Sequence, residues 1–169
     1  FFEFRFDRDS VVAAFRNYTF TNGRPIAKSL LVWGLMLGTN QVTPSLDQNF
    51  EIEHLVAKER QNRDKVLSDG RKIESLGNKA ILEKSINIRA SEYKFADKLR
   101  YYKGFTTEKG KRKGGTINGE LLRFANERSD FVESDIDERF EKMLNRLIDF
   151  LAKNKSAKIW MATTKAKKV

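Results

Sequence analysis

Apolar side chains recur at helical spacing in several stretches of the chain, and these stretches predict most of its helices. Residues 25–37 are apolar on nearly every side, which indicates a buried helix that ends near Gly38. A second helical pattern runs through residues 85–102. The last predicted helix covers residues 134–153, where apolar residues stand three and four positions apart: Ile136, Phe140, Met143, Leu144, Leu147, Ile148 and Leu151.

Two short segments in the middle of the chain predict strands. Residues 49–56 include Phe50 and Ile52 in alternation with polar residues, and residues 79–83 contain a short apolar run. The highly charged residues 58–72 between them indicate a solvated connection with some helix. Residues 103–115 are rich in glycine and lysine and predict a flexible, strongly basic loop. The pattern as a whole predicts an α+β fold, mostly helical, with a small antiparallel hairpin at its centre.

Composition narrows the class of protein. The 169 residues are 40% hydrophobic and 33% charged, which is typical of a soluble globular domain. The absence of cysteine excludes disulfides, a thiolate zinc site and a cysteine nucleophile, and is compatible with the cytoplasm. The longest apolar run, residues 30–37, is far shorter than the ~20 residues of a membrane span. We therefore expect a cytoplasmic protein without a membrane partner.

The start of the chain predicts that it is part of something larger. It begins with Phe1-Phe2-Glu3, without an initiator methionine and without the features of a signal peptide. We expect residues 1–45 to be a helical lead-in from a longer protein, or the start of a processed product, and residues 154–169 to be a frayed basic tail.

The charge balance points to a polyanionic partner. Lysine and arginine number 33 against 23 acidic residues, which gives a net charge of +10. Such a balance is typical of proteins that bind nucleic acid. The alternative is a soluble protein that is merely basic.

The only histidine, His54, is the first candidate for chemistry, and it directly follows Glu53. A lone histidine is more often structural than catalytic. Neighbouring side chains on a strand point to opposite faces, so these two residues serve one site only if the strand bulges or ends there.

Two asparagines form the second part of the candidate site. Asn78 and Asn87 are nine residues apart, one in a predicted turn and the other at the start of a predicted helix. An amide oxygen can ligate a hard divalent cation, and a turn asparagine can hold a loop by hydrogen bonds. The alternatives are an ordinary turn residue for Asn78 and a helix N-cap for Asn87.

Together, Glu53-His54, Asn78 and Asn87 resemble the HNH, or ββα-metal, nuclease motif in residue type and order. The chain is most similar to the C-terminal nuclease domains of GmrSD-like, modification-dependent restriction and anti-phage proteins. The shared features are the opening Ile52-Glu53-His54, the turn Leu76-Gly77-Asn78 and the segment Phe95-Ala96-Asp97-Lys98. The chain departs from the pattern at Ala57, where relatives commonly have proline, and in residues 58–75, which form an insertion.

The resemblance implies a nuclease domain in residues 46–153, with a ββα core at about 49–102, the basic loop 103–115 and the C-terminal helix 134–153. It implies that His54 is the general base, that Asn78 positions it, and that Glu53 and Asn87 bind one Mg²⁺ or Mn²⁺ ion. It also implies that the chain is the effector part of a defence protein whose sensor or NTPase-like domain lies upstream.

The basic residues around this motif are candidates for contacts with DNA phosphates. They lie beside Asn87, on the following helix and in the basic loop: Lys84, Arg89, Lys98, Lys111, Arg112 and Lys113. We therefore expect a metal-dependent DNA endonuclease that nicks as a monomer or cuts both strands as a homo-oligomer. The alternative is a non-catalytic DNA-binding or assembly module with a decayed nuclease fold; RNA as the substrate also remains open.

Overall fold

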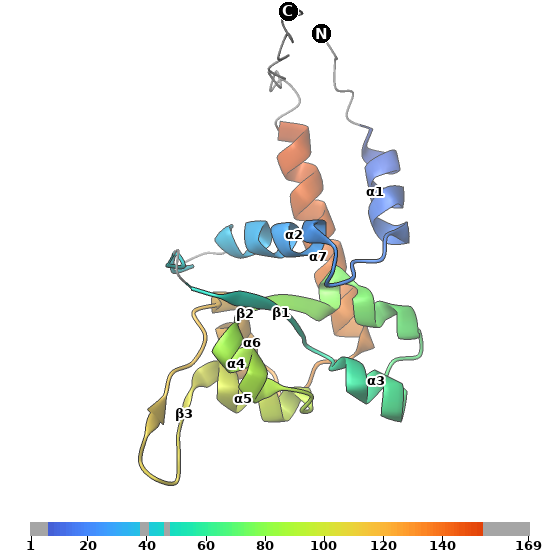
Figure 1. Cartoon of the computed structure of the whole chain (residues 1–169). Helices are drawn as coiled ribbons and strands as arrows, with labels where there is room; N and C mark the ends of the chain where they lie inside the picture. The colour runs from blue at the N-terminus through green and yellow to red at the C-terminus, as the bar shows by residue number, and fades with distance from the viewer. Residues whose placement is uncertain (1–6, 38–40, 46–47, 154–169) are drawn as a thin grey trace, which may run out of the picture.

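The computed structural model describes residues 7–37, 41–45 and 48–153. Figure 1 shows a small central hairpin with helices on both sides. In order, the elements are α1 (Arg8–Asn17), α2 (Pro25–Met36), β1 (Phe50–His54), α3 (Lys58–Asp64), the 3-10 turns η1 (Gly70–Glu74) and η2 (Leu76–Asn78), β2 (Lys79–Glu83), α4 (Lys84–Ala90), α5 (Phe95–Lys103), β3 (Phe105–Thr106), β4 (Arg112–Lys113), α6 (Gly119–Glu127) and α7 (Glu133–Lys153). The predicted α+β class, mostly helical, is confirmed.

The antiparallel pair β1–β2 is the centre of the fold. Its register places Phe50 opposite Glu83 and His54 opposite Lys79. β2 is buried along its whole length, and α4 begins directly after it. The order strand, strand, helix predicted for the middle of the chain is therefore present.

Two hydrophobic clusters lie on the two faces of this hairpin. The larger contains Leu55, Leu82 and Ile86 together with residues of α5, α6 and α7. The smaller is formed by Ile81 and Leu76 with Phe20, Ala27 and Leu31. The lead-in thus shares a core with the hairpin, because α2 contributes its apolar face to it (Figure 1).

The predicted helical pattern of residues 85–102 is interrupted in the structure. α4 ends at Ala90, and Ser91 takes a positive φ of 41° while its backbone N–H donates to the Asn87 carbonyl. α5 then begins at Phe95, so the chain turns between two helices where the sequence predicted one. Asn87 lies inside α4, and the N-cap position belongs to Glu83.

The basic segment 103–115, predicted as a loop, contains secondary structure that the sequence analysis did not predict. These residues include an antiparallel ribbon in which Phe105 pairs with Lys113 and Thr106 pairs with Arg112. The turn closes through hydrogen bonds from Thr107 N–H to the Lys111 carbonyl and from Gly110 N–H to the Thr107 carbonyl. The sequence analysis missed these strands because each contains only two residues.

α7 is the longest helix and packs against η2. Gly77 lies so close to it that an added Cβ would overlap the Ile136 carbonyl oxygen. The Arg139 guanidinium donates to the carbonyls of Leu76, Gly77 and Lys79 at 2.6–3.0 Å. The helix predicted at 134–153 is therefore present, begins one residue earlier, and fixes the turn that precedes β2. No helix among the described residues is long and apolar enough to cross a membrane.

Candidate functional site

The predicted pair Glu53 and His54 lies at the end of β1, but the two side chains face different surroundings. β1 ends at His54, as a shared site would require. Glu53 nevertheless contacts residues of α5, whereas His54 contacts Glu74 at the end of η1. The structure therefore brings the two residues together through their backbone and separates their side chains.

Glu53 belongs to a buried polar cluster. Its Oε1 accepts hydrogen bonds from Lys98 Nζ at 2.7 Å and from the Tyr102 hydroxyl at 2.9 Å. Burial raises the pKa of the Glu53 carboxyl, and the Lys98 charge opposes that rise. Tyr102 was not predicted; its position four residues after Lys98 places both on one face of α5.

Lys98 has a structural role in place of the DNA contact predicted for it. The side chain is fully buried, and its ammonium also donates to the His54 carbonyl at 2.6 Å. A phosphate on the surface does not reach this nitrogen. Lys98 instead fixes the end of β1 through both a carboxylate and a backbone carbonyl.

His54 lies in a second, mixed-charge cluster. Its Nε2 is 3.9 Å from Glu74 Oε2, and the same carboxylate oxygen accepts from Lys79 Nζ at 2.5 Å. Lys79 Nζ also donates to Asn22 Oδ1 at 2.6 Å. His54 Nε2 is buried and makes no hydrogen bond within the described part of the chain. The sequence analysis did not select Glu74, because this residue belongs to the insertion between the two strands and comes close to His54 only in the folded chain.

The surroundings keep His54 in its neutral form. Burial, followed by the charge of Lys79, lowers the pKa of the imidazole to about 4, and Glu74 only partly offsets this shift. At neutral pH the ring therefore retains a nitrogen lone pair. A neutral imidazole is the form that can accept a proton.

Asn78 holds the backbone that follows His54. Its Oδ1 accepts from the Val56 N–H at 2.8 Å, and its Nδ2 donates to the carbonyls of Val56 and Ile73, both at 3.1 Å. Its own carbonyl accepts from the Leu55 N–H at 2.8 Å. Asn78 thus holds the backbone after β1, which is the role of a turn residue; its positioning of the His54 side chain stays a prediction.

Asn87 lies beside Glu51, a residue that the sequence analysis did not select. Asn87 Nδ2 donates to Glu51 Oε2 at 3.0 Å, and Lys84 Nζ is 3.7 Å from the other oxygen of that carboxylate. Glu51 and Glu53 are two residues apart on one strand and therefore point to the same face. The two-residue spacing between Glu51 and Glu53 could therefore have identified Glu51 as a site residue from the sequence.

The oxygen donors at this face fit a hard divalent cation. Carboxylate and amide oxygens are the ligands that Mg²⁺ prefers, usually few in number and completed by water. The amide nitrogen of Asn87 donates to Glu51, so the amide oxygen of Asn87 is the atom that could bind a cation. Glu53 is already paired with Lys98, so the donors fit better at Glu51 and Asn87 than at Glu53. No group of three or more acidic or histidine side chains suited to a metal occurs among residues 7–37, 41–45 and 48–153.

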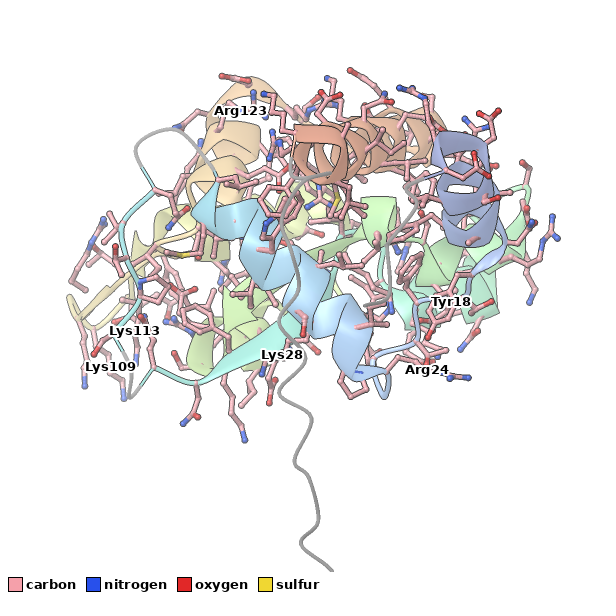
Figure 2. All side chains as sticks on the ribbon, turned by 90° about the horizontal axis from the view of Figure 1, so that it is seen from above. Tyr18, Arg24, Lys28, Lys109, Lys113 and Arg123 are labelled. Carbon is pink, nitrogen blue, oxygen red and sulfur yellow. The ribbon has the colours of Figure 1, made fainter. Side chains whose placement is uncertain are left out.

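Two of the remaining predicted basic residues line an open groove of about 600 Å³, and the other three lie on the β3–β4 ribbon. Lys84 and Arg89 line it from α4, and Ile117 closes the other side. Lys111 and Arg112 are exposed on the β3–β4 ribbon, and Lys113 is half-buried there. In Figure 2 the labelled Lys109 and Lys113 lie at the edge of the molecule, far from Tyr18 and Arg24.

Comparisons with known proteins identify no relative of this chain. No protein-family model matches the chain, and neither a curated protein nor a solved structure matches it significantly. The resemblance to HNH nucleases therefore stays a prediction that rests on the residues quoted above.

Proposed function

We propose that this chain is a metal-dependent DNA endonuclease domain in which His54 is the general base. The observation that carries the proposal is the neutral, partly exposed imidazole at the end of β1, with a buried nitrogen that makes no hydrogen bond in the described part of the chain. It is supported by the order β1, β2, α4, by the bonds of Asn78 to the backbone after His54, and by Asn87 on α4.

Each residue has a definite role in this mechanism. His54 takes a proton from the water that attacks the phosphorus, and the nearby Glu74 carboxylate stabilises the imidazolium that forms. The bond from phosphorus to the 3′ oxygen breaks, and that oxygen takes a proton from solvent, which leaves a 3′-hydroxyl and a 5′-phosphate. Asn78 holds the backbone that follows His54, and Lys98 binds the carbonyl of His54 itself.

Asn87 and Glu51 would hold a divalent cation, and such a cation would supply charge neutralisation at a phosphate. Because Glu51 and Glu53 point to the face of β1 opposite His54, the cation and His54 act on one phosphate only if it lies across the end of the strand, where β1 stops at His54.

The biological setting is a further part of the proposal. A restriction or anti-phage role with an upstream sensor domain is supported only by the sequence resemblance. The net charge of +10 supports a nucleic acid as the substrate, whatever that setting is.

The test is relaxation of supercoiled plasmid in Mg²⁺ or Mn²⁺, with wild-type protein compared with His54→Gln and Asn87→Ala. Loss of the base is expected to slow nicking by roughly 10²–10⁴-fold, because general-base catalysis contributes an acceleration of that order. EDTA is expected to abolish nicking. Asn126→Ala provides the matched control for Asn87→Ala, because Asn126 is exposed on α6, which does not contribute to the candidate site.

Nicking that persists in folded His54→Gln protein would exclude the mechanism. Circular dichroism of each variant establishes that it is folded. An unchanged rate in Asn87→Ala would exclude the cation position while leaving the role of His54 intact.

A second candidate is a DNA-binding module without catalytic activity. It is favoured by the separation of the Glu53 and His54 side chains and by the pairing of Glu53 with Lys98. This candidate predicts no nicking by wild-type protein in either metal, together with retention of DNA in a low-salt gel shift.

A further inference from the structure

The β3–β4 ribbon with its connecting turn, residues 105–113, forms a basic arm on the surface. Four cationic residues, Lys109, Lys111, Arg112 and Lys113, stand against one carboxylate, Glu108. All but Lys113 are exposed. Figure 1 shows that the arm extends away from the helices of the body.

The base of the arm is held tightly against α5. Gly104 takes a φ of 77°, and the Thr116 N–H donates to the Tyr102 carbonyl at 2.9 Å. Gly115 lies so close to this chain that an added Cβ would overlap the Tyr102 carbonyl oxygen. The neighbouring Gly114 has open space around it. The direction of the arm therefore depends on close backbone packing at Gly115.

A buried carboxylate ties the arm to the β1–β2 hairpin. Glu83, the last residue of β2, accepts from the Thr116 hydroxyl at 2.6 Å and from the Ile117 N–H at 2.7 Å. α4 begins at the next residue. Glu83 thus connects β2 and α4 with the segment that follows the arm, Thr116 and Ile117.

The open groove lies between α4 and this return segment. Lys84 and Arg89 contribute positive charge from the helix side, and the exposed Ile88 adds an apolar contact. Arg89 and Arg100 also lie over the Phe105 ring at the start of the arm, at 6.0 and 5.1 Å from its centroid. Positive charge is therefore continuous from the arm to the groove.

The arm has the features of a surface for duplexes. A two-stranded ribbon fits the major groove of B-DNA, and lysine and arginine contacts to phosphates fix its position there. Surfaces for single strands instead use aromatic side chains on which bases stack. The arm contains one aromatic residue, Phe105, whose ring packs edge-on against Tyr101 and lies beneath the two arginines.

We propose that the arm is a preorganised docking element for double-stranded DNA, which places one strand of the duplex in the groove beside α4. The proposal rests on the proposed function for its choice of DNA. It adds that the substrate is a duplex and that the position of the arm, as well as its charge, determines binding.

The first test compares Gly115→Ala with Gly114→Ala, two full-length variants of identical charge. Fluorescence anisotropy measures binding to a labelled 30-base-pair duplex, and to one of its strands, in EDTA so that no cleavage occurs. Gly115→Ala is expected to weaken duplex binding on the order of tenfold, because the arm loses its preorganised direction. Gly114→Ala is expected to bind like wild-type protein. Equal duplex affinities for these two variants would overturn the role of arm position.

The second test varies charge, and it remains decisive if Gly115→Ala fails to fold. K109Q/K111Q/R112Q/K113Q is compared with R16Q/R63Q/R71Q/K142Q, which removes four cations from exposed ion pairs outside the arm. The salt dependence of duplex binding should fall by about 0.9 in the log–log slope for each phosphate that the arm no longer neutralises, in the arm variant only. An equal decrease in the two variants, or equal affinity of wild-type protein for duplex and single strand, would overturn the proposal.

These measurements separate the two proposals. Arm-dependent duplex binding without metal-dependent nicking would support the arm and exclude the nuclease. Nicking by protein whose arm variants bind normally would support the nuclease and exclude the arm.

Discussion

At the scale of single residues, the pKa values of two neighbouring side chains of β1 shift in opposite directions. Glu53 is buried beside the cation of Lys98, while His54 is half-buried near Lys79 and Glu74. Burial disfavours the charged form of both side chains, so it raises the pKa of Glu53 and lowers that of His54. The consequence for function is a histidine that is neutral at pH 7 but a weaker base than a free imidazole, so it depends on Glu74 to stabilise the imidazolium when it accepts a proton.

The first prediction concerns the titration of His54 in metal-free protein. Because His54 is the only histidine, its imidazole gives a single set of NMR signals. We expect a midpoint near pH 4, well below the ordinary value of 6.5. Between these pH values the unfolded chain binds a proton that the folded chain does not, so the free energy of unfolding falls as the pH decreases from about 7 to about 4.

The size of this effect is measurable in urea. Each unit of pKa difference corresponds to about 1.4 kcal/mol, so the loss is on the order of 2–3 kcal/mol across this range. His54→Gln lacks the titrating group and should show a smaller loss. A midpoint at 6 or above in folded protein would contradict the burial of His54.

At the scale of elements, short turns decide how the helices meet the central hairpin. η2 is only three residues long, yet it supports Asn78 and contacts α7. The approach is close because residue 77 has no side chain, and Arg139 of α7 bonds to three carbonyls of the same turn. The orientation of Asn78 therefore depends on a helix that lies far away in the sequence.

The second prediction is that Gly77→Ala separates η2 from α7. The new Cβ overlaps backbone atoms of α7, which cannot move aside as a flexible side chain would. We expect a loss of about 2–4 kcal/mol in the free energy of unfolding, as for other steric or packing defects in a core. Gly23→Ala is the control, since its Cβ would meet nothing within 4 Å, and a change within about 0.5 kcal/mol is expected. Equal stability of the two variants in urea would contradict the close approach.

At the scale of the whole molecule, one hairpin serves both hydrophobic clusters. Ile81 faces the cluster of α2, whereas Ala80 and Leu82 face the cluster of α4 to α7. Adjacent residues of β2 thus pack into the two different hydrophobic clusters and connect them. We therefore expect the N-terminal helices and the candidate site to unfold as one cooperative unit.

The third prediction follows from this shared hairpin. Leu31→Ala removes a buried side chain of α2 and is expected to cost about 2–5 kcal/mol. Unfolding should remain a single transition when it is followed by both far-ultraviolet circular dichroism and tryptophan fluorescence. Leu37→Ala is the control, because that side chain is 48% exposed and should change stability by under about 1 kcal/mol. Two separated transitions in the wild-type protein would show that the clusters fold independently.

Local patterns in the sequence predicted the elements whose apolar spacing is regular. Residues 25–37 and 134–153 form helices as expected, and the two central strands pair as a hairpin. The break at Ser91 was missed because the apolar spacing continues through it, and the β3–β4 ribbon was missed because its strands are short. α2 ends at Met36, two residues before the expected helix end near Gly38, and the candidate tail at 154–169 lies outside the described residues.

The sequence by itself determined the α+β class, the order strand, strand, helix and the candidate residues His54, Asn78 and Asn87, because these depend on local spacing and residue type. Only the tertiary structure decided which side chains share surroundings. It paired Glu53 with Lys98, placed Glu74 beside His54, and set Glu51 against Asn87. Such pairings depend on contacts between residues 20 to 45 positions apart, and burial at those contacts determines whether a charged side chain reaches a phosphate or stabilises the core.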